Sequence, residues 1–157
     1  MTAALIRSPN PARPISRRPA TLLGVGMDLA GQRDFSHLDD ASIRRAADRW
    51  LWPHERAWCA AQPSFREAMI IVLSCKEAMY KAWGASGEFH QLSLTMQRCG
   101  AQGRAVKAGI GPEVVASWEV VNGSILTFAV AGPTGWSWHL LDRILGERRS
   151  AGPERAR

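Results

Sequence analysis

The sequence predicts an α+β domain in which an antiparallel sheet packs against a long central helix. Three observations support this class: period-two alternation at residues 22–29, a strongly apolar helical stretch at 64–83, and β-rich segments on both sides of Asn122-Gly123. Asn-Gly between two such segments is the strongest short signal for a hairpin. The order of strand, helices and then antiparallel strands is typical of an α+β fold.

Composition and charge divide the chain into one domain with two basic tails. Its 157 residues are 46% hydrophobic and include seven Trp, enough to bury a substantial core. All of the net charge of +6 lies in residues 1–21 and 142–157, which are rich in Arg, Pro, Ser, Ala or Gly. We therefore expect a disordered basic N-terminal tail at 1–21, a folded domain at 22–141 and a basic C-terminal tail at 142–157.

Targeting signals and cysteine spacing favour the cytoplasm. No apolar run approaches the ~20 residues that span a bilayer, and the start lacks the pattern of a signal peptide. Cys59, Cys75 and Cys99 are widely spaced, in neither a CxxC pair nor a metal-ligand pattern. We expect a cytoplasmic protein with reduced thiols and no membrane partner.

The first strand, Leu22–Leu29, has two unlike faces. One face is apolar: Leu23, Val25, Met27 and Leu29. The other is almost bare and ends in a carboxylate: Gly24, Gly26 and Asp28. Glycine in a strand often marks the close approach of a ligand or of another backbone, and the alternative is a bulged strand with Asp28 in solvent.

The helices and the later strands follow from caps, breakers and alternation. A helix is expected from Ser36 to Trp50, with Ser36 or Asp39 as its N-cap. A second helix is expected to start at Trp52-Pro53-x-Glu55, bury Trp58 and end near residues 62–63. Strands are expected in four further segments: Phe89–Met96, Val114–Val121, Ser124–Ala131 and Trp136–Leu141.

The end of the central helix carries the charges that matter most for function. Lys76, Glu77 and Lys81 follow a run of five large apolar residues. Glu77 and Lys81 are four residues apart, so they share a face of the helix. Charges at the end of a buried helix cost free energy unless they are paired or bind something. Two interpretations remain open, namely an ordinary solvated Glu–Lys pair and a functional site.

Two separated segments resemble the 4′-phosphopantetheinyl transferase superfamily. Residues 24–29 (GVGMDL) resemble its first strand, GhGhDh, where h is apolar. Residues 76–84 (KEAMYKAWG) resemble its signature helix, KEAxxKxxG. The spacing of these segments and the β-rich end also fit, and the length is similar to that of the short holo-acyl-carrier-protein synthase class.

The resemblance implies a reaction and the residues that carry it out. Phosphopantetheine would move from coenzyme A, the second substrate, to a serine of an acyl or peptidyl carrier protein in fatty-acid or polyketide biosynthesis. Asp28 and Glu77 would hold Mg²⁺, and Glu77 and Lys81 would be the catalytic residues. Lys81 would contact the pyrophosphate, and Lys76 the nucleotide phosphates unless it merely reaches solvent.

The resemblance also implies partners. Basic residues beside the active strand would bind an acidic carrier protein: Arg33, Arg44, Arg45 and Arg49. A helix face paired with Asp40 or Asp48 is the alternative for these arginines. A short member of the family would form a homotrimer with its site at the subunit interface.

The sequence departs from the family pattern, and two alternatives to transfer stay open. Ala30 and Gly31 stand where the family usually has another acid, and residues 116–119 lack a histidine found near the end of the short class. A relative that binds carrier protein or coenzyme A without transfer is therefore one alternative. A metal-dependent nucleic-acid-binding protein built on Asp28, Glu77 and a Lys is the other. It is disfavoured because metal nucleases generally need the Glu and Lys two apart on a strand, and because basic tails alone read no sequence.

Overall fold

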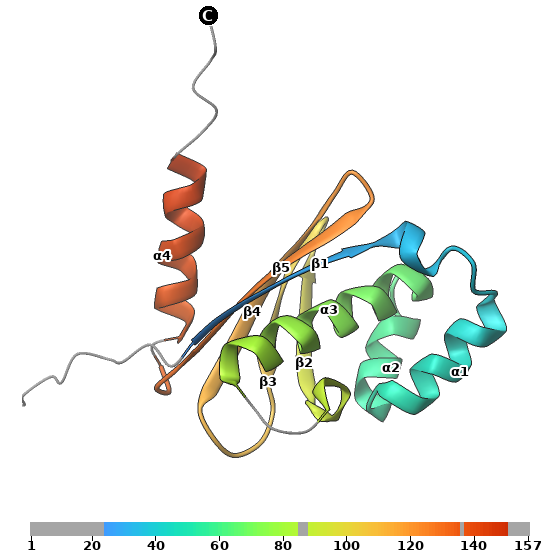
Figure 1. The fold of residues 1–157 in the computed structure, drawn as a ribbon, viewed down its shortest axis with the longest axis horizontal. Coiled ribbons are helices and arrows are strands. Elements are labelled where there is room, and N and C mark those ends of the chain that lie inside the picture. The colour runs from blue at the N-terminus through green and yellow to red at the C-terminus, as the bar shows by residue number, and fades with distance from the viewer. Residues whose placement is uncertain (1–23, 85–87, 136, 151–157) are drawn as a thin grey trace, which may run out of the picture.

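The computed structural model describes residues 24–84, 88–135 and 137–150. Eleven elements follow one another along the chain (Figure 1): β1 (Gly24–Gly31), η1 (Gln32–Phe35), α1 (Asp40–Trp50), α2 (Pro53–Ala60), α3 (Phe65–Trp83), η2 (Phe89–Gln91), β2 (Leu94–Cys99), β3 (Gln102–Lys107), β4 (Glu113–Val121), β5 (Ser124–Gly132) and α4 (Ser137–Ser150). None of the helices among these residues combines the length and apolarity that crossing a membrane demands. The expected N-terminal tail lies outside the described residues.

One five-stranded sheet has the order β1-β5-β4-β3-β2, and each neighbouring pair is antiparallel. β1 and β2 form its edges. β1, the first strand of the chain, pairs with β5, the last one. In that register Asp28 lies opposite Thr127. The α+β class predicted from the sequence is confirmed, because this antiparallel sheet packs against the long helix α3 (Figure 1).

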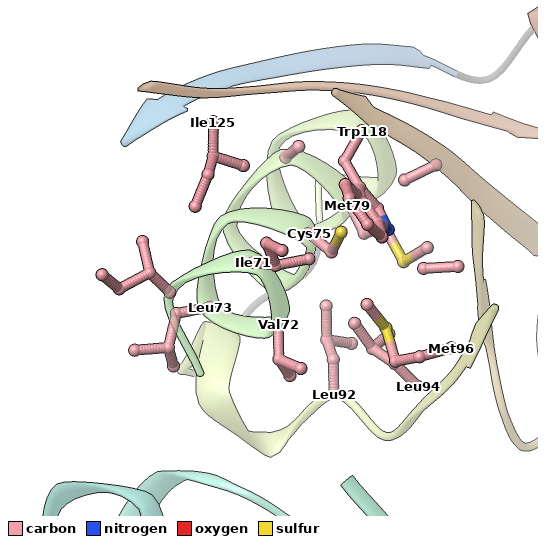
Figure 2. Close-up of a cluster of buried hydrophobic side chains, with 14 of the residues drawn as sticks. Ile71, Val72, Leu73, Cys75, Met79, Leu92, Leu94, Met96, Trp118 and Ile125 are labelled. Carbon is pink, nitrogen blue, oxygen red and sulfur yellow. The ribbon is translucent and has the colours of Figure 1, made fainter. Parts of the chain in front are cut away.

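The helix α3 is buried on most of its surface because it lies between the sheet and the smaller helices α1 and α2 (Figure 1). The five apolar residues from Met69 to Leu73 are each at most 7% exposed. Figure 2 shows side chains of α3, including Cys75 and Met79, close to Trp118 and Ile125 of the sheet. The sheet on one side and α1 and α2 on the other thus bury a helix that is apolar on nearly all sides.

Local capping explains where the helices begin and end. Asp39 caps α1 by accepting a hydrogen bond from the Ser42 backbone N–H at 2.7 Å, which selects Asp39 over Ser36 as the N-cap. Ser64 caps α3 in the same way, and Gly84 ends that helix in the left-handed region with φ 64°. Asn122 and Gly123 have φ values of 52° and 77°, as expected for the tight turn between β4 and β5.

The face of β1 that carries Gly24 and Gly26 lacks side chains because α3 lies directly on it. A Cβ atom at Gly24 would lie 2.0 Å from the Ala82 carbonyl oxygen, and one at Gly26 would lie 1.9 Å from that of Ala78. Any side chain at these positions would push the helix away from the strand. Close approach of another backbone, one of the expected causes, therefore accounts for these glycines.

The apolar face of β1 points away from α3 and is largely uncovered. The exposed fractions are 48% for Val25, 53% for Met27 and 67% for Leu29. The helix α4 packs on the same side of the sheet, where Leu141 joins a small cluster with Val115 and Val130. That cluster lies toward one end of the sheet, so a stripe of apolar side chains on β1 remains open.

Two expectations about elements were wrong. Residues 137–141 begin α4 rather than a strand, because Trp138, Leu141 and Leu145 recur at helical spacing. α4 continues to Ser150, so the expected boundary between domain and tail falls inside a helix. Phe89 lies in η2, and the strand of that region begins at Leu94. The sequence analysis also predicted no strand in the region of β3, Gln102–Lys107.

The second helix buries different residues than expected. α2 starts at Pro53 as predicted, but Trp58 is only partly buried, whereas Glu55 and Cys59 are fully buried. Burial raises the pKa of the Cys59 thiol to about 12 and that of the Cys75 thiol still further. Both cysteines are free, as expected, and their thiols stay protonated at neutral pH.

Candidate functional site

Two carboxylates converge on one ammonium where β1 meets α3. Lys81 Nζ lies 3.1 Å from Asp28 Oδ1 and 2.9 Å from Glu77 Oε1, and it also donates to the Met27 carbonyl oxygen at 3.2 Å. The expected pairing of Glu77 with Lys81 is therefore present, but it is part of a three-residue cluster rather than an isolated pair. Asp28 and Glu77 lie on the same side of the sheet, as the predicted site requires.

Asp28 is held by the Ser74 hydroxyl, which in turn contacts the Thr127 hydroxyl. Ser74 Oγ donates to Asp28 Oδ2 at 2.8 Å and lies 2.9 Å from Thr127 Oγ1. Because the Ser74 proton goes to Asp28, its oxygen is left to accept the proton of Thr127. Asp28 is only 13% exposed, so this chain of hydroxyls orients one carboxylate oxygen inward and leaves the other for a cation.

The other two members of the cluster face solvent. The side chains of Lys81 and Glu77 are 45% and 44% exposed. The hydrogen bond to Glu77 raises the pKa of Lys81, partial burial opposes this, and Asp28 raises the pKa further. Lys81 is therefore a stable cation at neutral pH, held at an accessible position where it can meet an anionic substrate.

Lys76 is not at this site, which corrects the expectation that it reaches nucleotide phosphates or solvent. Its ammonium is fully buried and lies 2.7 Å from Glu55 Oε2. It also donates to the carbonyl oxygens of Trp50 at 3.2 Å and His90 at 2.9 Å. Burial lowers the pKa of Lys76, and Glu55 opposes that shift. With its partners all inside the protein, Lys76 is a structural residue.

The four arginines expected to bind a partner are all exposed and lie on η1 or α1. Arg45 donates to Ser42 Oγ at 2.8 Å, and the Arg44 guanidinium lies 5.0 Å from the centre of the Phe65 ring. Arg33 and Arg49 have no acidic partner among the described residues.

The acids considered as partners for these arginines are engaged elsewhere. Asp40 pairs with Arg66 at 2.8 Å and Asp48 with Arg56 at 3.6 Å. The alternative in which Asp40 or Asp48 neutralises the helix face is therefore not what this structure contains, and α1 presents net positive charge.

The Asp28–Glu77 pair fits the needs of Mg²⁺. This ion favours hard oxygen ligands and is usually held by one or two carboxylates, with water and phosphate oxygens completing its shell. The two carboxylates already hold one positive charge between them, that of Lys81. The part of the chain that the structure describes contains no cluster of three or more His, Cys, Asp or Glu side chains, so the remaining ligands would come from water and substrate.

The positions that usually supply another acid have a different role here. Gly31 ends β1, and its N–H donates to Asp34 Oδ2 at 2.9 Å. A Cβ atom at Gly31 would lie 3.0 Å from that oxygen. An acidic side chain at position 31 would therefore approach the carboxylate of Asp34, which η1 places beside this end of the strand.

Sequence reasoning missed Ser74, Thr127 and the partnership of Glu55 with Lys76. Ser74 precedes Glu77 by three residues and shares its helix face, and it interrupts an apolar run, which is a usable signal. Thr127 needs the strand register, since only pairing places it opposite Asp28. Glu55 was recognised as a first-turn acid, but nothing local indicates its contact with a lysine of another helix.

Comparison with known proteins agrees with the family suggested by the two motifs. The family model described as 4′-phosphopantetheinyl transferase superfamily matches residues 24–129. No curated protein sequence matches the chain. Among the solved structures that share the fold are three that are each a holo-acyl-carrier-protein synthase.

The first of these, from Neisseria meningitidis, has a TM-score of 0.57 at 20% identity and covers 71% of this chain and 98% of its own. That from Plasmodium yoelii has a TM-score of 0.58 at 16% identity, covering 75% and 100%. That from Bacillus anthracis, in complex with CoA (3′,5′-ADP), has a TM-score of 0.56 at 16% identity, covering 72% and 98%. The family match runs from β1 into β5 and includes both charged segments, so the chain belongs to the 4′-phosphopantetheinyl transferase superfamily.

Proposed function

We propose that this protein transfers 4′-phosphopantetheine from coenzyme A to a serine of an acyl or peptidyl carrier protein in the cytoplasm, in a Mg²⁺-dependent reaction. The observation that carries the proposal is the convergence of Asp28 and Glu77 on Lys81 at the seam between β1 and α3. These are the residues at which the two family motifs meet in space, and the family match supports the reaction class.

In this reaction the serine oxygen of the carrier attacks the phosphorus that bears pantetheine. A new P–O bond forms to serine, and the bond to the bridging oxygen breaks, so adenosine 3′,5′-bisphosphate leaves with the bonding electrons. Lys81 contacts the pyrophosphate and stabilises the negative charge that grows on the departing group. Asp28 and Glu77 keep Lys81 protonated and in place before substrate arrives.

Asp28 and Glu77 are the residues that would hold Mg²⁺. When bound, the ion neutralises the pyrophosphate and aligns the attacking and leaving oxygens. The solvent-facing Glu77 is the better candidate to accept the serine proton, because Asp28 already accepts a hydrogen bond from Ser74. Catalytic roles thus fall to Glu77 and Lys81, and metal binding to Asp28 and Glu77.

The carrier protein docks on the basic face of α1 and the adjoining η1. Arg33, Arg44, Arg45 and Arg49 would face the acidic helices that carrier proteins generally present. Charges at the rim of an interface mainly set the association rate and its salt dependence. Arg45→Glu should therefore slow carrier modification at low salt with little change in coenzyme A affinity. An unchanged KM for the carrier at both low and high salt would contradict this docking face.

Self-association, as a trimer, uses the open stripe on β1. Val25, Met27 and Leu29 are large, contiguous and about half exposed or more, which is unusual for a surface that meets only water. Met27→Lys should lower the mass measured by light scattering to that of one chain. A wild-type protein that already has the mass of a single chain would contradict the proposal.

The departures at Ala30 and Gly31 favour one competing function, a relative that binds its partners without transfer. Intact-mass spectrometry of an apo carrier protein incubated with this protein, coenzyme A and Mg²⁺ distinguishes the two. A carrier that gains the mass of phosphopantetheine, only when coenzyme A and Mg²⁺ are both present, supports transfer. Binding of carrier proteins without a mass gain, across fatty-acid, polyketide and peptide-synthetase carriers, contradicts it and supports the binding relative.

A further inference from the structure

A pocket of about 220 Å³ lies where α1, α2 and η2 meet. We call it the corner pocket, and its main lining residues are Arg49, Trp50, Trp52, Pro53, His90 and Gln91. It is separate from the Asp28–Glu77–Lys81 cluster, none of whose residues line it. Trp52 is one of the few large apolar side chains of the described chain that remain exposed, at 46%.

The buried Lys76–Glu55 pair holds both walls of the corner pocket. On the helix wall, Lys76 donates to the Trp50 carbonyl oxygen, and Glu55 Oε2 accepts from the Trp52 backbone N–H at 2.8 Å. On the η2 wall, Lys76 donates to the His90 carbonyl oxygen. Glu55 Oε1 accepts from the Leu94 backbone N–H at 2.8 Å, just beyond that wall.

The two walls also touch directly. The indole N–H of Trp52 donates to the Gln91 carbonyl oxygen at 3.2 Å. The shape of the pocket is thus set by a buried ion pair and a network of backbone hydrogen bonds. A preformed apolar recess costs little ordering when a partner binds, which is the property of an interface anchor site.

Charge around the corner pocket selects the kind of partner. Arg49 lies on its rim, and Arg45, one turn earlier in α1, is also exposed. The nearby acids Asp40 and Asp48 pair with Arg66 and Arg56, and the charge of Asp39 interacts with that of Arg45. Arg49 is therefore the rim cation without an acidic partner among the described residues. An occupant that is acidic around an apolar side chain complements this surface.

We propose that the corner pocket receives an apolar side chain from an acidic helix of the carrier protein, with Arg45 and Arg49 pairing with acids on either side of it. The inference rests on the proposed transfer reaction and adds to it an anchor that fixes where the carrier helix lies. It also gives a purpose to Lys76 and Glu55, which act as positioning residues for the pocket rather than on the substrate.

Steady-state transfer kinetics with an apo acyl carrier protein test the anchor. Trp52→Ser removes one wall, and Gln91→Trp fills the recess from an exposed position. Each should raise the KM for the carrier about tenfold while the KM for coenzyme A stays within about twofold. Trp52→Phe, which keeps an aromatic ring, should restore most of the loss. The matched control is Val121→Ser, which removes an apolar side chain of similar exposure, 44%, from β4.

The outcomes separate the anchor from the reaction. An unchanged carrier KM in Trp52→Ser and Gln91→Trp overturns the anchor and leaves the transfer reaction standing. Equal rises in the KM for carrier and for coenzyme A also overturn it, since the effect would then be structural. A wild-type protein that transfers to no carrier contradicts the proposed reaction and removes the occupant with it.

Discussion

Two lysines of α3, five residues apart, are each paired with carboxylates and yet differ in every physical respect. Lys76 and Glu55 are both 0% exposed, and the ammonium has two further backbone partners. Lys81 is 45% exposed and lies between Asp28 and Glu77. Burial lowers the pKa of Lys76, whereas the hydrogen bond to Glu77 raises that of Lys81.

The difference shows that pairing alone does not identify a site. A buried ion pair has little net value against well-packed apolar residues, but losing one partner leaves an uncompensated charge. Such a pair fixes structure. A half-exposed lysine between two carboxylates can exchange those partners for a phosphate or share them with a metal ion, so it can take part in chemistry. The buried lysine of the motif, Lys76, therefore supports the fold, and the exposed one, Lys81, is the one that we propose for the reaction.

Removing one partner of the buried pair should have the largest effect. Lys76→Met leaves the Glu55 carboxylate buried without its counter-charge, which should lower the free energy of unfolding by about 3–5 kcal/mol. Urea denaturation followed by circular dichroism measures the change. Lys81→Met is the control and should lie within about 1 kcal/mol of wild type. If the two variants lose equal stability, the contrast between the lysines is wrong.

Removing the exposed lysine should instead abolish most of the activity. In the proposed reaction Lys81→Ala deletes the charge that stabilises the departing nucleotide, so transfer should slow about a hundredfold or more. The rate is measured by intact mass of the carrier over time, and circular dichroism checks that the fold is intact. Turnover equal to wild type would mean that Lys81 is only a partner of Glu77.

The close contact between β1 and α3 sets the distance from Asp28 on the strand to Glu77 and Lys81 on the helix. Gly26→Ala places a Cβ against the Ala78 carbonyl oxygen and should cost about 1–3 kcal/mol of stability as well as activity. Gly146→Ala is the matched control, because nothing lies within 4 Å of a Cβ there and the position is helical. It should be neutral or stabilising by about 0.5–1 kcal/mol. Equal effects at both positions would argue against the close approach.

The two lysines should also differ in how they link stability to pH, which is the smallest effect. The folded pKa of Lys81 lies above its ordinary value of 10.5. Its contribution is therefore complete below pH 10.5 and is lost as the pH rises through the folded pKa. Lys76 has its folded pKa below 10.5, so the unfolded chain binds more protons between those values and stability rises with pH there.

Urea titrations of wild type and Lys81→Met at several pH values test this contrast. Their difference in unfolding free energy should be constant below pH 10.5 and shrink above it. A difference that already disappears near neutral pH would contradict the raised pKa of Lys81.

Local signals in the sequence predicted the elements that position the site, and non-local contacts account for what it missed. The strand that carries Asp28 and the helix that carries Glu77 were both predicted, because the alternation of β1 and the spacing of α3 are strong periodic signals, and both side chains contact Lys81. The burial of Lys76 could not be read from the same motif, because it depends on Glu55 of another helix. The start of α4 was misread as a strand because the apolar residues that complete its helical spacing lie beyond residue 141.

Asp28 links the fold to the proposed reaction most directly, because Ser74 holds it on the inner side and Lys81 contacts it on the outer side. Asp28→Asn keeps the size of the side chain and an oxygen that can accept from Ser74, but it removes the negative charge and turns the acceptor that faces Lys81 into a donor. Intact-mass spectrometry of an apo carrier with coenzyme A and Mg²⁺ should then show phosphopantetheine transfer slowed about a hundredfold or more, with the fold and the buried Lys76–Glu55 pair unaffected. Transfer by Asp28→Asn at the wild-type rate would contradict the assignment of this cluster as the active site.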